Sequence, residues 1–179
     1  MRTHTPLSQH GAALITGLIF LVVLTLISLS AIKSTSLEER MAGNARDQDV
    51  AFEAAEAGIR DAMGSLAGLS PSSAFAAGCS AGLCLNDPVT PVWTSVVWSS
   101  SQTKAYTGTA LTFNGSTTLP NQPRYIIELM PGTVPAFGSS ATVGKGLTSG
   151  AQLTPYRITA RGWGITGQTQ ATVQATVAY

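Results

Sequence analysis

The chain has 179 residues, enough for one globular domain with an appended segment but not for two full domains. Charged residues make up 11% of the chain, about half the usual share, and the formal net charge is +1. This balance argues against strong electrostatic attraction to nucleic acid or to anionic lipid. So few charges are typical of a protein that packs against other protein or lies in the cell envelope.

The first predicted element is an apolar helix. The segment from Ala12 to Ile32 has 21 residues and no charge, and as a helix it would be about 31 Å long, close to the hydrocarbon thickness of a bilayer. Thirteen of its residues are Leu, Ile, Val or Phe, each favouring insertion by roughly 0.3–0.6 kcal/mol. We therefore predict a membrane-spanning helix that the mature protein retains. A cleavable secretory signal, cut near "SLSAIKS", is the alternative.

The helical period continues beyond the apolar segment, and it predicts an amphipathic stem over residues 33–69. No proline occurs between Leu7 and Pro71, so we expect one helix of about 55 residues. A separate second helix, capped within residues 34–38, is the alternative. Residues 33–61 carry seven acidic and four basic side chains, interpreted as a solvated face with a supporting Glu56–Arg60 pair. The predicted apolar stripe, broken only by Gln48, is Leu37, Met41, Ala45, Phe52, Ala55, Ile59, Met63 and Leu66.

Residues 70–179 are predicted to form a β-rich head with a small antiparallel sheet covered by the upper stem. Alternating patterns predict strands in "RYIIELM", "YRITARGW" and "ATVQATVAY", with a hairpin at residues 164–167 between the last two. Weaker patterns predict strands in "VWTSVVWSS" and "TALTFN". Residues 131–155, rich in Gly, Ser and Thr, are predicted to form a long surface loop.

The two cysteines indicate in which compartment the head lies and how the apolar segment is oriented in the membrane. Basic residues flank the apolar segment almost evenly, so they do not orient it. The short spacing of Cys79 and Cys84 suits a small disulfide loop, which would place the head in an oxidising compartment and the N-terminus in the cytoplasm. Two free thiols are the alternative. Two cysteines without a nearby histidine do not complete a zinc site, so we expect no metal or cofactor.

The head lacks the residues that common catalytic sites need. Both histidines, His4 and His10, precede the apolar segment, so no Ser-His or Cys-His nucleophile is available in the head. The only acidic residues after residue 61, Asp87 and Glu128, lie far apart in sequence. Three tryptophans beside a basic excess could stack on sugar or single-stranded nucleic acid, but packing in the core is the commoner role. We expect no enzymatic activity.

The order of leader, apolar helix, amphipathic helix and sheet domain resembles that of type IV pilins. The stretch from Gly11 to Ala62, and above all its "LEERMAGNxRD…AFxAAEAG" run, is similar to the N-terminal region of PilX-type minor pilins. The segment "YRITARGWG" and the final alternating strand resemble their C-terminal part. The resemblance implies an α+β pilin-like fold, with a long N-terminal helix packed on a small β-sheet head, and a structural role in type IV pilus assembly.

The resemblance also implies processing. Residues 1–11 would be a leader, prepilin peptidase would cut after Gly11, and the new amino group of Ala12 would be methylated. Thr16 stands at the fifth mature position, where the family usually has a glutamate that neutralises the amino terminus of the subunit ahead of it. A buried charge without its partner is costly. The departure at Thr16 therefore favours a place at the pilus tip, where no subunit lies ahead.

The implied partners are other minor pilins, the major pilin, prepilin peptidase and the inner membrane, with nucleic acid not expected as a specific ligand. The chain would wait in the inner membrane with its head in the periplasm, then reach the cell surface in the pilus, supporting adhesion, twitching motility or DNA uptake. Two alternatives stay open. One is the tip pseudopilin of a type II secretion system, and the other is a single-span envelope protein whose head binds a ligand.

Overall fold

The computed structural model describes residues 10–69, 73–136 and 152–179. The chain divides into two units, Met1–Ala45 and Arg46–Tyr179. Helix α1 covers His10–Ser65, and a short 3-10 helix, η1, follows at Leu66–Gly68. The predicted single helix is thus confirmed. The alternative of a separate capped helix is wrong, because α1 continues without a break through residues 34–38.

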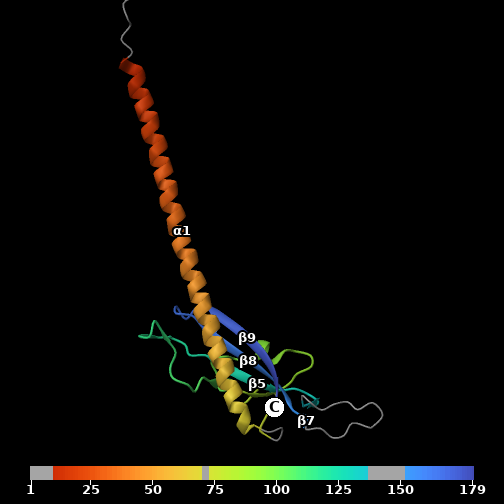
Figure 1. Cartoon of the computed structure of the whole chain (residues 1–179). Helices are drawn as coiled ribbons and strands as arrows, with labels where there is room; N and C mark the ends of the chain where they lie inside the picture. The colour runs from red at the N-terminus through yellow and green to blue at the C-terminus, as the bar shows by residue number, and fades with distance from the viewer. Residues whose placement is uncertain (1–9, 70–72, 137–151) are drawn as a thin grey trace, which may run out of the picture. The chain divides into compact units, whose positions relative to one another are not determined.

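The head is built on one five-stranded sheet. Four strands follow the order β1 (Leu83–Leu85), β5 (Arg124–Leu129), β8 (Pro155–Trp163) and β9 (Gln170–Ala178), and β2 (Lys104–Ala105) also pairs with β5. The three long strands, seen side by side in Figure 1, are those that alternation predicted, and the turn at residues 164–169 joins β8 to β9.

The sheet is mixed, so the prediction of an antiparallel sheet is wrong in one respect. β5, β8 and β9 pair antiparallel, but β1 runs parallel to β5, with Leu83 opposite Ile127. The 38 residues between β1 and β5 return the chain to the starting end of the sheet, which parallel pairing requires. A three-residue strand has too little alternation to reveal its direction in the sequence.

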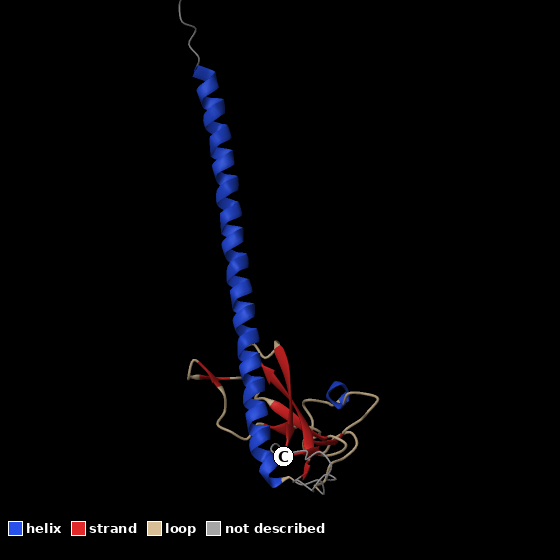
Figure 2. Ribbon diagram, turned by 45° about the vertical axis from the view of Figure 1, so that its right-hand side comes forward, coloured by secondary structure: helices blue, strands red, loops and turns tan. Residues whose placement is uncertain are grey.

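The core lies between the later part of α1 and one face of the sheet, as the prediction for the upper stem expected. Figure 2 shows this part of the helix running along the strands. The buried cluster joins side chains of α1 and η1 to side chains of β5 and β8: Ile59, Ala62, Leu66, Tyr125, Ile127, Tyr156, Ile158 and Ala160. The half-buried side chains of Val173, Ala175 and Val177 in β9 extend this cluster to the edge of the sheet.

The face of α1 that is buried differs from the predicted stripe. Ala55, Ile59 and Leu66 are buried as expected, but Phe52 and Met63 remain about half exposed. The buried residues are mostly small, and the first of them is acidic: Asp47, Ala51, Ala54, Ala55, Ala57, Gly58, Ile59, Ala62 and Leu66. A helix that approaches a sheet closely buries small side chains, which hydrophobicity alone does not select.

The other face of the sheet is covered by the connection between β1 and β2. Here Val92–Ser95 forms a helical turn, α2, so the strand predicted in "VWTSVVWSS" is wrong. Pro91 precedes the turn, and the hydroxyl of Ser95 donates to the carbonyl oxygen of Val92. Val92, Val96 and Trp98 pack against Ile126, so their hydrophobicity reflects a covering loop and not a strand.

Two small ladders complete the head. The strand predicted in "TALTFN" is reduced to β3 (Thr112–Phe113), which pairs with β4 (Thr117–Thr118) around Asn114 and Gly115, both with positive φ. β6 (Val134–Pro135) pairs with β7 (Gln152–Leu153). The predicted loop over 131–155 therefore has paired ends, and its residues 137–151 lie outside the described residues.

Candidate assembly site

The apolar part of α1 exposes its side chains over the whole described length of the first unit. Large hydrophobic residues from Leu14 to Ile32 are exposed, with values of 72% and 66% at these two ends. α1 is the one helix in the described part of the chain that is long and apolar enough to span a membrane. Such a surface is stable only in lipid or against other protein.

The hydroxyl groups of this segment do not interrupt its apolar character. Thr16 donates to the carbonyl oxygens of Ala12 and Ala13, both at 3.0 Å. Thr25, Ser28 and Ser30 likewise donate to carbonyl oxygens three or four residues earlier. Because each hydroxyl is satisfied by its own helix, the segment can enter an apolar environment without an unpaired donor.

Asp47 fastens α1 to the turn between β8 and β9. Its side chain is 6% exposed, although the sequence interpretation placed the stem carboxylates on a solvated face. One oxygen accepts from the backbone N–H of Thr166 at 3.1 Å, and the other accepts from the hydroxyls of Thr166, at 2.7 Å, and Thr169. Burial raises the pKa of Asp47, but the hydrogen bonds from Thr169 and Thr166 outweigh it and lower the pKa below the ordinary value of 3.8.

Beside this carboxylate, α1 and β8 approach so closely that only glycine fits. A Cβ atom at Gly162 would lie 2.2 Å from the carbonyl oxygen of Ala51, and one at Gly164 would lie 2.3 Å from the Asp47 carboxylate. One at Gly58 would lie 3.1 Å from the Cβ of Ala160. The "AFEAAEAG" and "ARGWG" stretches, which carry the resemblance at the two ends of the chain, therefore form the two sides of one contact.

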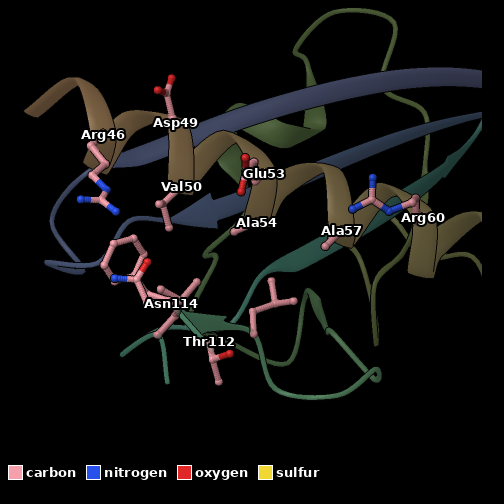
Figure 3. Close-up of a pocket in the computed structure, with 12 residues that line it drawn as sticks. Arg46, Asp49, Val50, Glu53, Ala54, Ala57, Arg60, Thr112 and Asn114 are labelled. Carbon is pink, nitrogen blue, oxygen red and sulfur yellow. The ribbon is translucent and has the colours of Figure 1, made fainter. Parts of the chain in front are cut away.

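α1 and the β3–β4 hairpin enclose a groove of about 510 Å³ (Figure 3). The guanidinium of Arg46 lies 4.6 Å from the centre of the Phe113 ring and closes one end. Asp49, Glu53 and Arg60 supply charges of both signs along the helix. The groove thus has mixed polarity and no cluster of like charge.

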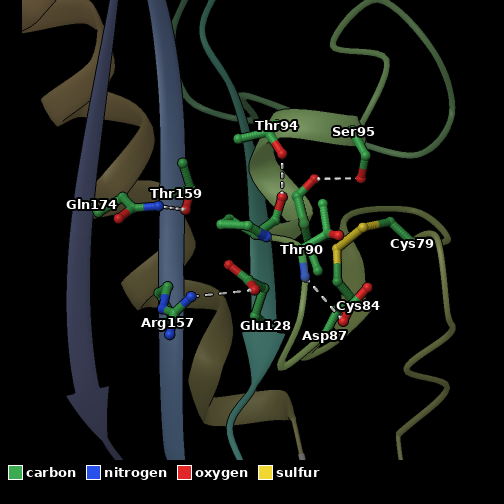
Figure 4. Close-up of polar contacts among 12 residues, drawn as sticks. Cys79, Cys84, Asp87, Thr90, Thr94, Ser95, Glu128, Arg157, Thr159 and Gln174 are labelled. Carbon is green, nitrogen blue, oxygen red and sulfur yellow. Dashed lines mark hydrogen bonds and ion pairs between the residues drawn. A yellow bond between two sulfur atoms is a disulfide. The ribbon is translucent and has the colours of Figure 1, made fainter.

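The disulfide between Cys79 and Cys84 closes a six-residue loop at β1, so the prediction of a disulfide is confirmed and that of free thiols is wrong (Figure 4). Cys84 is fully buried and packs with Trp98 and Ile126. The loop is folded tightly, with positive φ at Cys79 and Gly82. A Cβ at Gly82 would lie 2.6 Å from the Cβ of Lys104, so this glycine lets β2 approach the loop.

Glu128 lies opposite Cys84 on β5 and is 0% exposed. Its carboxylate has one ion pair, to Arg157 at 3.7 Å across the β5–β8 register, and neither oxygen has a hydrogen-bond partner in the described residues (Figure 4). Burial raises the pKa of Glu128, and the charge of Arg157 opposes this shift only in part. A carboxyl group in this position stabilises the head less than its pairing with arginine implies.

The structure places the predicted residues in two settings. Gly11, Ala12 and Thr16 lie in the first turns of α1, and the cysteines meet in the head. Sequence reasoning missed Asp47 and Glu128 as buried groups. A signal was present for Asp47, since it stands four residues before Ala51 on the alanine face. Among the described residues, no group of three His, Cys, Asp or Glu side chains could hold a metal ion.

An exposed apolar N-terminal helix whose later part covers a β-sheet head defines a pilin-like subunit. The family model described as "PilX N-terminal" matches residues 10–60, and the model described as "Type IV pilus assembly protein PilX C-term" matches residues 79–179. The chain therefore belongs to the PilX family of type IV pilus assembly proteins and is a minor pilin. This family is structural and not catalytic, and the match supports the pilus interpretation over the secretion and envelope-protein alternatives. No curated protein and no solved structure matches the chain.

Proposed function

We propose that this minor pilin initiates pilus assembly from the tip. In this proposal residues 1–11 are a leader, residues 12–32 form the membrane and assembly helix, residues 33–69 form the stem and residues 70–179 form the head. Prepilin peptidase removes the leader after Gly11 and methylates Ala12. The chain is first held in the inner membrane with its head in the periplasm, and it later stands in the pilus at the cell surface.

The hydrogen bond from Thr16 to Ala12 is the observation that carries the tip position. The Thr16 hydroxyl is satisfied by its own helix and has no charge to offer the amino terminus of another subunit. A subunit placed ahead would bury its charged terminus without a counter-ion, which costs several kcal/mol. At the tip no subunit lies ahead, so this cost does not arise.

The exposed apolar surface supports the step from membrane to pilus. Its transfer from lipid to the helices of neighbouring pilins exchanges one apolar environment for another, at roughly 25 cal/mol per Å² in either case. The direction of the step is therefore decided by the other contacts, those of the heads with the other minor pilins and the major pilin. These contacts form the start of a pilus that supports adhesion, twitching motility or DNA uptake.

Position in the pilus can be tested by labelling. In cells that make pili, a small epitope inserted after Asn114, at the tip of the β3–β4 turn, should be detected by immunogold at pilus ends. The same chain with Thr16→Glu should spread along the shaft, while Thr16→Gln, of similar size but uncharged, should stay at the ends. Wild-type label along the shaft, or no difference between the two variants, would contradict the tip position.

Processing and initiation are tested separately. The intact mass of the purified mature chain should correspond to a start at methylated Ala12. Deleting the gene should reduce surface pili while leaving the amount of the major pilin unchanged. An uncut start at Met1 would contradict the processing, and normal piliation would contradict initiation.

A further inference from the structure

β9 forms a nine-residue edge of the sheet. Its inner side pairs with β8 without interruption, and no described strand pairs with its outer side. Thr154 and Tyr179 exchange both backbone hydrogen bonds. Because hydrogen-bonded and non-hydrogen-bonded pairs alternate along an antiparallel ladder, this pair determines which residues of β9 bond to β8 and which point away from it. The residues whose backbone groups point away from β8 are Gln170, Thr172, Gln174, Thr176 and Ala178.

This edge lacks the features that usually prevent strand addition. From Gly164 to Tyr179 the chain has no charged residue and no proline, and the nine pairs with β8 contain no bulge. Exposed edges in monomeric proteins are commonly protected by lysine, proline or a bulge. A long, regular and uncharged edge is therefore suited to pair with another strand.

The apolar core of the head is only partly covered beside this edge. Val173, Ala175 and Val177 face α1 and are only half-buried. Phe52 lies nine residues, or two and a half turns, before Asp61, and so on the opposite flank of the helix. Asp61 accepts from the backbone N–H of Thr107, which follows β2 on the far side of β5, so the flank with Phe52 faces β9.

Met63 lies three turns beyond Phe52 on the same flank, and the two side chains are 41% and 48% exposed. Together with Val173, Ala175 and Val177 they form an apolar shelf along the outer side of β9. A strand added to β9 would place every second side chain against this apolar shelf, and the remaining side chains beside Thr172 and Thr176.

The occupant is not a second copy of this chain. α1 runs opposite to β8, since Asp47 lies at Gly164, Ala55 at Gly162 and Gly58 at Ala160. Antiparallel pairing of two β9 strands about a twofold axis would reverse this direction in the second copy. A twofold pair of this kind closes on itself, whereas the open assembly of a pilus needs heterologous contacts between its subunits. Symmetric parallel pairing would set identical donors against each other.

We propose that the outer edge of β9 binds an extended segment of a different subunit of the pilus machinery, which adds a strand to the sheet. The segment is uncharged and alternates apolar side chains, which cover the apolar shelf, with small polar ones. This inference rests on the proposed function only for the source of the partner.

Hydrogen exchange tests the pairing directly. The full chain in detergent is compared with the same chain in the complex co-purified with the other minor pilins, with exchange resolved at single amides. The outward amides of Thr172, Gln174 and Thr176 should exchange fast in the chain alone and at least about tenfold more slowly in the complex. The inward amides of Val173 and Ala175 should be protected in both. Equal exchange of the outward amides would overturn the proposal.

Thr176→Pro is the matching variant, because it removes an outward N–H without removing a hydrogen bond to β8. Thr176→Ala keeps the N–H and is its control. The proline variant should bind the complex at least about tenfold more weakly than the alanine variant. Equal binding would overturn the proposal. If the proline variant does not fold, the exchange result on the unmodified chain decides. Pili that still require the chain while its outward amides stay unprotected would refute strand addition and leave the proposed function standing.

Discussion

The carboxylate of Asp47 holds both the backbone N–H and the hydroxyl of Thr166, 119 positions further along the chain. The first residue lies where α1 enters the head, and the second lies in the turn between β8 and β9. The contact therefore joins α1 to the sheet at this point, in addition to the apolar core. Since Asp47 is only 6% exposed, its carboxylate depends on Thr166 and Thr169 for its hydrogen bonds.

Replacing Asp47 with Asn should lower the free energy of unfolding of the head by about 1–3 kcal/mol, because charge-assisted hydrogen bonds are replaced by weaker ones. The lowered pKa of Asp47 fixes the pH dependence. Its contribution is present above the ordinary value of 3.8 and is lost as pH falls through the lower folded value. Denaturant unfolding of the full chain in detergent should therefore show a difference between wild type and variant that disappears in strong acid.

The control for this variant is Asp49→Asn, which changes an exposed carboxylate half a turn away and should leave stability within about 0.5 kcal/mol of wild type. Equal effects of the two substitutions would show that loss of any stem charge, and not the contact with Thr166, is responsible.

Gly162→Ala should destabilise the head by about 3 kcal/mol or more, since its Cβ would lie 2.2 Å from the carbonyl oxygen of Ala51 and backbone would have to move. Gly64→Ala is the matched control, because Gly64 lies in α1 within the same unit, Arg46–Tyr179, and a Cβ added there would have no atom within 4 Å. It should be neutral or stabilising by up to about 1 kcal/mol, as expected for helical glycine. Thermal unfolding measures both, and similar midpoints for the two variants would contradict the close approach.

Glu128→Gln should stabilise the head at neutral pH. Burial raises the folded pKa of Glu128, so its contribution is most favourable below the ordinary value of 4.5 and is lost as pH rises through the folded value. The gain in melting temperature of the variant over wild type should therefore grow from pH 4 to pH 8. Arg157, which is partly exposed, can be solvated when its partner is neutral. A variant less stable than wild type at pH 8 would show that the ion pair outweighs the burial.

Reduction of the Cys79–Cys84 disulfide should cost about 2 kcal/mol, the value that the chain-entropy relation gives for a six-residue loop. The double variant Cys79→Ala with Cys84→Ala should show the same loss without reductant. Unfolding of the full chain with and without dithiothreitol provides the measurement, and the double variant should no longer respond to the reagent. An unchanged midpoint for the reduced wild type would contradict a stabilising role.

The sequence by itself determined the elements whose patterns are long and local. Twenty-one uncharged residues are enough to predict the apolar helix, and alternation over residues 156–161 and over residues 171–179 is enough to predict β8 and β9. The spacing of Cys79 and Cys84 likewise predicted their disulfide, because a loop of six residues costs little conformational entropy to close. These features depend on neighbours in the chain, so no knowledge of distant residues is needed.

Only the tertiary structure decided the features that arise where segments distant in the sequence come together. The burial of Asp47 follows from Thr166 and Thr169 folding over it, and the direction of β1 follows from the path of the 38 residues after it. Val92–Ser95 forms a helical turn although its residues favour strands, because the segment covers Ile126 with its apolar side chains and pairs with no strand among the described residues. Local patterns record which side chains avoid water, but only the packed molecule specifies which partner removes them from it.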